Sequence, residues 1–100
     1  MFTNERYVTQ GISLEIPEEI QLALWIKIDN LRRNNIIELD YLQVFKLSEH
    51  NGEQRIIHIQ EQPEYHNDIL IKFTCESVKK AKIFVIDDGN YTTMMLASEY

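Results

Sequence analysis

The sequence contains little cysteine, proline or glycine. Cys75 is its only cysteine, so no disulfide can form within the chain, which is typical of proteins from a reducing compartment. The three glycines are isolated, so there is no glycine-rich loop of the kind that cradles phosphate groups. With only two prolines and no low-complexity run, the chain lacks the composition of a disordered protein. We therefore expect one folded domain over residues 1–100.

Basic residues and long apolar runs are also scarce. Ten lysines and arginines stand against sixteen aspartates and glutamates, a formal net charge of −6, which disfavours a surface that follows nucleic-acid phosphates. The most apolar stretch, IQLALWIKIDNL, is interrupted by Gln21, Lys27 and Asp29 and is too short to cross a bilayer. The first residues, MFTNERYVTQ, contain no basic segment followed by an apolar one, so no signal peptide is predicted. We expect a cytoplasmic protein that binds neither nucleic acid nor membranes.

One long helix is the clearest element that the sequence predicts. Pro17 suits the first helical position, two glutamates follow it in the first turn, and two arginines stand in the last turn. Each of these charges has the sign that the helix dipole favours at its end. Asn34 or Asn35 can adopt the left-handed conformation that ends a helix. The helix is therefore expected from about residue 17 to residue 33.

Most of the remaining chain has the pattern of strands and tight turns. Asn51-Gly52 predicts a type I′ hairpin turn, which would place Phe45 opposite His58, and Asp88-Gly89 predicts a second hairpin. Further strands are expected over 6–13, 68–74 and 91–96, with a helix from Thr92 onward as the alternative for the last. These elements predict an α+β fold, a mainly antiparallel sheet of five to six strands with the long helix packed on one face. Their order along the chain would be β-α-β-β-β-β-β.

The predicted helix carries more apolar side chains than one sheet can cover. At 100° per residue, one set shares a single face: Ile20, Leu24, Ile28 and Leu31. A second set points nearly the opposite way: Leu22, Trp25 and Ile26. Either the chain ends or the segment 75–81 fold over this second set, because large apolar groups are usually buried. Or the set is an interface for another protein or a second copy, with Trp25 as its anchor.

The stretch HIQEQPEYH, residues 58–66, has the residue types of a metal or acid–base site. A structural zinc site needs four Cys or His ligands in short paired spacings, and the histidines and the cysteine of this chain are not so spaced. In an extended strand His58 and Glu61 point to opposite faces, so a two-histidine-plus-carboxylate set would need a turn at Pro63 to bring His66 back. We therefore predict no metal site and no cofactor.

The same stretch has a structural interpretation. HIQEQ is expected to be the polar end of a strand that Pro63 terminates, since proline cannot donate to a ladder, and EYH is expected to begin a crossing loop. Glu61, Glu64 and Tyr65 are then candidates for the edge of a binding surface.

Two adjacent carboxylates are the other candidates for chemistry. Asp87 and Asp88 follow the apolar run IFVI at a strand end, where such a pair could bind a divalent cation or act with His58 as catalytic groups. The structural alternative is turn chemistry, because Asp-Gly is a frequent turn pair and aspartate bonds its own backbone there.

Six stretches, in order along the chain, resemble a family of small Gram-positive bacterial proteins classed as a domain of unknown function. They are RYVTQGI, IPEEIQLALW, ELDYLQVFKL, HIQEQPEY, IFVIDDG and TTMMLASEY. The resemblance implies a small, single-domain, cytoplasmic protein. It carries over no enzymatic activity, no cofactor and no functional residue.

From the residues themselves, the first functional hypothesis is a non-enzymatic interaction or regulatory module. Such a module would self-associate or bind another protein through Leu22, Trp25 and Ile26. One alternative is a metal-dependent hydrolase or nuclease that uses Asp87, Asp88 and His58. A further alternative is an acidic mimic of DNA, which would require a contiguous face of carboxylates.

Overall fold

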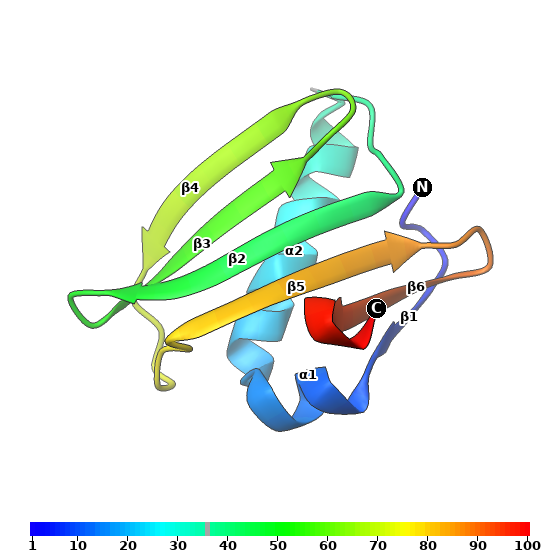
Figure 1. Cartoon of the computed structure of the whole chain (residues 1–100). Helices are drawn as coiled ribbons and strands as arrows, with labels where there is room; N and C mark the ends of the chain where they lie inside the picture. Colours follow the sequence, from blue (N-terminus) through cyan, green and yellow to red (C-terminus); the bar gives the residue numbers. More distant parts are fainter. Residues whose placement is uncertain (36) are drawn as a thin grey trace.

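The chain forms one six-stranded sheet with a long helix across one face (Figure 1). This computed structural model describes residues 1–35 and 37–100. The strand order is β1-β6-β5-β2-β3-β4. The strands are β1 (Glu5–Val8), β2 (Leu42–His50), β3 (Glu53–Gln60), β4 (Tyr65–Ile71), β5 (Lys80–Asp87) and β6 (Tyr91–Leu96). The helices are α1 (Gln10–Glu15), α2 (Glu18–Asn34) and the short 3-10 helix η1 (Ala97–Glu99).

The α+β class is confirmed, but the predicted arrangement of the sheet needs correction. The sheet is mixed rather than mainly antiparallel, because β1 runs parallel to β6 while the other neighbouring strands are antiparallel. The order along the chain also differs, since a helix, α1, follows β1. The parallel pair joins the first strand to the last, so no local turn signal could have indicated it.

Helix α1 replaces the second half of the strand predicted over 6–13. Thr9 is its N-cap, and the Thr9 hydroxyl accepts a hydrogen bond from the Ile12 backbone N–H at 3.3 Å. Ile12 then points into the core and is fully buried. The β-branched residues of this segment therefore serve a cap and a core contact rather than a longer strand.

Helix α2 agrees with its prediction except that Pro17 is the N-cap rather than the first helical residue. It starts directly after Pro17 and ends where Asn35 adopts the left-handed conformation, with φ of 49°. Its buried residues are those of the predicted sheet-facing set: Ile20, Leu24, Ile28 and Leu31. The helix thus packs its one continuous apolar stripe on the sheet, as an amphipathic helix must.

Both predicted hairpins are present, with the predicted pairing. Phe45 lies opposite His58 in β2 and β3, and Asn51 and Gly52 both have positive φ in the turn. Gly89, with φ of 99°, lies in the turn between β5 and β6, and residues 91–96 form a strand rather than a helix. The loop predicted at EYH is wrong, because β4 already begins at Tyr65 after a turn over 61–64.

A single carboxylate connects η1 to the start of α1. Glu99 accepts hydrogen bonds from the Thr9 hydroxyl at 2.6 Å, the Leu96 backbone at 2.8 Å and the Gly11 backbone at 3.2 Å. The bond from Thr9, followed by that from Leu96, lowers the pKa of Glu99. A β-carbon at Gly11 would lie 2.7 Å from the Glu99 carboxylate, so glycine leaves the space that this contact needs.

Glu99→Ala is expected to lower the midpoint of thermal unfolding by a few degrees, because the three hydrogen bonds that the Glu99 carboxylate accepts are lost. The measurement is thermal unfolding followed by circular dichroism. Glu76→Ala is the control, since Glu76 is exposed and has no hydrogen-bond partner among the described residues. Equal effects of the two substitutions would contradict the role of Glu99 in connecting η1 to α1.

Candidate functional site

Polar side chains lie buried beneath α2, on the inner face of the sheet. Gln43 of β2 and Gln54, His58 and Gln60 of β3 are all at most 1% exposed. Glutamine and histidine are seldom fully buried without hydrogen bonds, so their partners decide whether they form a reactive site or a structural network.

His58 occupies the centre of this network. Its Nε2 lies 2.7 Å from Gln43 Oε1, its ring stacks on Phe45 with centroids 4.3 Å apart, and Tyr65 meets it edge-on. Because the Gln43 amide nitrogen donates elsewhere, its oxygen faces His58, and we assign the imidazole proton to Nε2. His58 Nδ1 is buried and has no partner among the described residues.

His58 is neutral at physiological pH. Burial, with a smaller contribution from the positive charge of Lys27, lowers its pKa to about 3. Burial also lowers the pKa of Lys27, whose ammonium donates to Asn67 Oδ1 at 2.6 Å. A general base works best with a pKa near the working pH, so this imidazole has the properties of a structural hydrogen-bond donor.

Gln60 uses its side-chain amide fully. Its oxygen accepts from the Asp40 backbone at 2.8 Å and from Gln43 at 2.7 Å. Its nitrogen donates to the backbone carbonyls of Glu38 at 2.9 Å and Pro63 at 2.8 Å. The buried glutamine therefore joins the entry to β2 and the turn after β3, and no group of this amide is left for a ligand.

Asp87 and Asp88 also serve the backbone. Asp87 is 8% exposed and accepts from the Phe2 backbone at 2.7 Å, the Gly89 backbone at 2.8 Å and the Asn4 side chain at 3.0 Å. Asp88 accepts from the backbone of the two residues that follow Gly89, at 2.9 and 3.1 Å. This is the turn chemistry that the Asp-Gly pair suggested.

The three candidate catalytic residues are not brought together. His58 pairs with Phe45, which pairs with Ile83, and Asp87 lies four residues further along β5. Two strand spacings and four residues of rise separate the Cα atoms of His58 and Asp87 by roughly 16 Å. His66 shares the face of Ile59, opposite to His58. Among the described residues, no group of three or more His, Cys, Asp or Glu side chains could hold a metal ion.

Cys75 has no sign of an activated thiol. Burial, followed by the hydrogen bond and negative charge of Glu19, raises its pKa. Glu19 accepts hydrogen bonds from the backbone of Thr74 and Cys75, which fixes this segment to the start of α2.

One hollow lies on the outer face of the sheet, and sequence reasoning did not identify it. It measures about 570 Å³, and its lining residues are Leu42, Val44, Lys46, Ile59, Gln60, Glu61, Gln62, Glu64, Lys82 and Phe84. Two candidates for a binding edge, Glu61 and Glu64, are in this set, whereas Tyr65 points inward to His58. The signal in the sequence was that β2 and β5 carry apolar residues at positions facing both sides of the sheet. This pattern is typical of strands that are covered on both faces.

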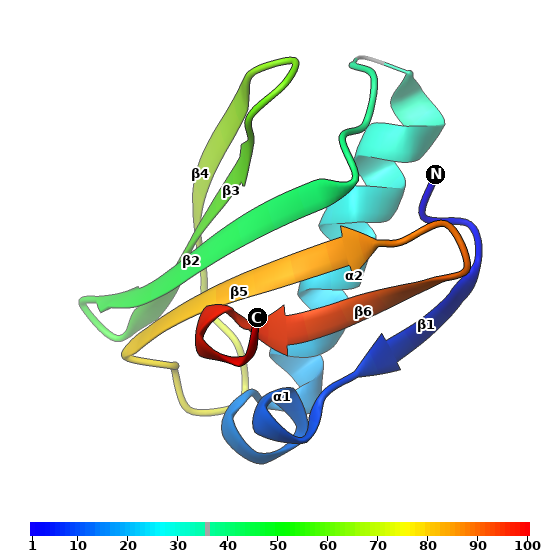
Figure 2. The same ribbon diagram turned by 45° about the vertical axis from the view of Figure 1, so that its right-hand side comes forward.

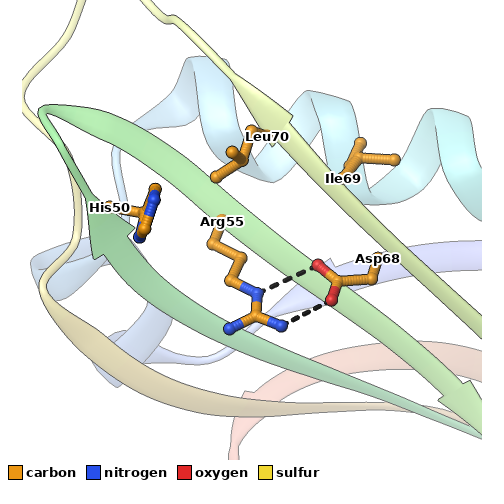
Figure 3. A pocket seen from close by; sticks show the side chains of 5 residues that line it. All are labelled: His50, Arg55, Asp68, Ile69 and Leu70. Atoms are coloured by element: carbon orange, nitrogen blue, oxygen red, sulfur yellow. Dashed lines mark hydrogen bonds and ion pairs between the residues drawn. The ribbon is translucent and has the colours of Figure 1, made fainter.

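A second hollow of about 490 Å³ lies near the β2–β3 turn (Figure 3). Arg55 of β3 and Asp68 of β4 form a two-point ion pair there, with Nε–Oδ1 at 3.0 Å and Nη2–Oδ2 at 2.5 Å, while His50 and Leu70 lie at its sides. The pair already neutralises the guanidinium, so Arg55 is not a free cation for an anionic ligand in this hollow.

The outward ridge of α2 divides into exposed and covered parts. Leu22 is 60% exposed and Ile26 is 47% exposed. Trp25 is partly buried against the core, and the Arg6 guanidinium lies over its ring at 4.8 Å. Arg6 is held there by an ion pair with Asp29. A hollow of about 310 Å³ adjoins the ridge, lined by Val8, Ser13, Glu18, Gln21, Leu22 and Trp25.

Fold and surfaces together define the class: a small α+β domain in which buried Gln43, Gln60 and Asp87 form hydrogen bonds to its own chain. Residues 5–99 match the family model described as "Staphylococcal protein of unknown function" (DUF960), and the chain belongs to that family. The resemblance seen in the sequence to a Gram-positive family of unknown function is thereby confirmed. No helix in the described residues is long and apolar enough to span a membrane.

A solved structure is similar over nearly the whole chain. It is the crystal structure of the protein of unknown function from Enterococcus faecalis, 28% identical in sequence, with a TM-score of 0.83. The match covers 97% of this chain and 91% of that chain. No curated protein matches the sequence.

Proposed function

We propose that the protein is a non-enzymatic interaction module that binds another protein through the outward ridge of α2. The ridge consists of Leu22 and Ile26, with Trp25 at its side. The observation that carries the proposal is the exposure of Leu22 and Ile26, one helical turn apart and 60% and 47% exposed. Val8 adds further exposed apolar surface beside Leu22, since both line the same hollow. Adjacent large apolar groups on one surface mark interaction sites more often than isolated ones do.

The charges around the ridge favour a partner with basic groups. Glu18, one helical turn before Leu22, is exposed and forms no ion pair within the described part of the chain. Glu18 also lines the hollow beside Leu22 and Trp25. A partner that inserts an apolar side chain into this hollow and carries lysine or arginine at its rim would be complementary to it. The fixed indole of Trp25 offers such a partner a rigid aromatic surface.

The test is photo-crosslinking in the bacterium that makes the protein, with a photoreactive amino acid at position 22. We expect one discrete adduct whose yield falls at least about tenfold with Ile26→Asp, because a carboxylate at the centre of the ridge disfavours apolar contact. Leu70→Asp is the matched control. Leu70 is 46% exposed, nearly as much as Ile26, but lies on β4.

The control should keep the adduct, and both variants should retain the wild-type thermal midpoint. An adduct that both variants retain equally, or no adduct from position 22, would overturn the proposal. The crosslinked peptide of the partner should contain basic residues next to apolar ones.

A further inference from the structure

We infer that the outer face of the sheet is a homodimer interface, in which two copies pack face to face about a twofold axis that runs across the strands. This face is opposite to α2 (Figure 2). The inference goes beyond the proposed function, because it uses a different surface and a different partner, a second copy of this chain.

The centre of the outer face is apolar. Ile59, Val44, Phe84 and Met95 are in register across β3, β2, β5 and β6, so they form one row perpendicular to the strands. Leu42 and Ile86 form a second paired position beside this row. The apolar side chains of this row and this pair are partly exposed, whereas an inner-face neighbour such as Phe45 is fully buried. Rows of this kind form the contact between the two sheets of a β-sandwich.

One end of the hollow carries two uncompensated positive charges. Lys46 lies directly opposite Lys82 in β2 and β5, and like charges in this position destabilise a sheet. Neither lysine forms an ion pair within residues 1–35 and 37–100. Lys82 instead lies 5.7 Å from the centre of the Phe84 ring. An acidic partner at this end would remove the repulsion.

The other end of the hollow carries two negative charges. Glu61 and Glu64 are exposed residues of the turn between β3 and β4, and both line the hollow. Glu61 lies four residues beyond Ile57, the cross-strand neighbour of Lys46. At the rise of a strand, the two charged ends are ~13 Å apart along the strand direction, with the apolar row between them.

This distribution of charge is complementary to itself. A twofold interface uses the same patch on both copies, so each group must meet its opposite across the axis. Lys46 and Lys82 lie on β2 and β5, whereas Glu61 and Glu64 follow β3, so the axis must cross the strands obliquely, perpendicular to the line from the lysine pair to the glutamate pair. A half-turn about this axis places the lysine pair of each copy over the glutamate pair of the other. The axis crosses the row near Val44 and Ile59, so the centre of the row packs on its counterpart at the spacing of stacked sheets. An axis along the strands would instead place lysine over lysine.

Other occupants fit the face less well. An anionic amphiphile would use the lysines and the apolar floor, but it would place its apolar tail beside Glu61 and Glu64 and leave both charges unpaired. Helix η1 bounds the face at β5 and β6, where Tyr100 meets Phe84 edge-on at 5.7 Å and is itself 82% exposed. The open part of the face is therefore the part between the two charged ends.

Charge reversal provides the test. Lys46→Glu/Lys82→Glu places negative charge at both ends of the face, and Glu61→Lys/Glu64→Lys places positive charge at both ends. We expect the wild type to sediment as a dimer and each variant alone as a monomer, with Kd raised at least about tenfold. An equimolar mixture of the two variants should form a heterodimer, because every charged contact is then again between opposite signs. Sedimentation velocity and native mass spectrometry measure both results.

Matched controls separate this geometry from general charge effects. Arg33→Glu/Lys79→Glu and Glu49→Lys/Glu76→Lys change the net charge equally at exposed positions that do not line the hollow. Each control should remain a homodimer. Ile26→Asp should also leave this dimer intact, so failure of the α2 ridge proposal and failure of this inference are distinguishable. Circular dichroism should show that all variants are folded.

Three outcomes would overturn the inference. The first is a wild type that is monomeric at its highest soluble concentration, including a monomer whose outer face binds an acidic peptide. The second is a dimer that charge reversal leaves unchanged but Ile26→Asp dissociates. The third is a pair of charge-reversed variants that stay monomeric when they are mixed.

Discussion

Asp87→Ala is expected to lower the free energy of unfolding by about 3–5 kcal/mol, because three hydrogen bonds to one buried carboxylate are lost. The donors are the backbone N–H groups of Phe2 and Gly89 and the side chain of Asn4. The Phe2 backbone N–H is buried, and after the substitution no other acceptor would replace the Asp87 carboxylate. Phe2 is fully buried in the core, so loss of this anchor also weakens apolar packing. Urea unfolding at neutral pH measures the change.

Asp88→Ala is the matched control for this prediction. Asp88 is exposed and its hydrogen bonds lie within its own turn, so we expect a cost of only about 1 kcal/mol. A smaller cost for Asp87→Ala than for Asp88→Ala would contradict the role of Asp87 as the anchor of the amino-terminal segment.

The ionisation of Asp87 adds an acid dependence. Burial alone raises the pKa of this carboxyl, but the hydrogen bonds from Phe2, Gly89 and Asn4 and the charge of the chain amino terminus together lower its pKa below the ordinary value. A lowered folded-state pKa means that the carboxylate stabilises the fold above its unfolded pKa and loses this contribution as the pH falls through the folded value. For Asp87 that loss begins below about pH 4.

Acidification from pH 7 to pH 4.5 is expected to remove about 2.5 kcal/mol of stability through His58 alone. The unfolded imidazole takes up a proton below about pH 6.5, whereas the pKa of the folded imidazole is about 3. Between these values the unfolded state binds more protons, so stability rises with pH and falls on acidification. The slope approaches about 1.4 kcal/mol for each pH unit. This window lies mostly above that of Asp87, so the two effects are separable.

His58→Gln isolates the histidine contribution. Glutamine keeps an N–H donor for Gln43 but cannot take up a proton in this range. The variant should be less stable at pH 7, because the stacking on Phe45 is lost. Its stability should nevertheless decline much less between pH 7 and pH 4.5. Parallel pH profiles of variant and wild type would show that the folded imidazole is protonated more easily than its burial implies.

Local signals in the sequence were sufficient for the helix α2 and for both hairpins. Pro17 and Asn35 mark the helix ends through their backbone preferences, and Asn51-Gly52 sets a register in which Phe45 faces His58. The parallel β1–β6 pair and α1 were not predictable in this way. Their stabilising contacts, such as Thr9 with Glu99, join residues that are 90 positions apart.

The burial of the polar network could not be predicted from the same signals. The alternation in HIQ places His58 and Gln60 on one face, and the turn at Asn51 places Gln43 beside them, but glutamine is usually exposed. The backbone carbonyls that satisfy Gln60 belong to Glu38 and Pro63, in segments without a local pattern. The outer apolar face was missed because the predicted sheet was expected to be covered on one face only, the face beneath the helix.

The pairing of β1 with β6 has a consequence for how the chain folds during its synthesis. A nascent chain that has not yet extended beyond β5 can close the β2–β3–β4 meander and lay α2 on it, but its first strand has no neighbour to pair with. The first strand therefore remains unpaired until β6 has been synthesised and has left the ribosome. Completion of the sheet edge is then the final step, and chaperones or proteases have access to residues 5–8 until that moment.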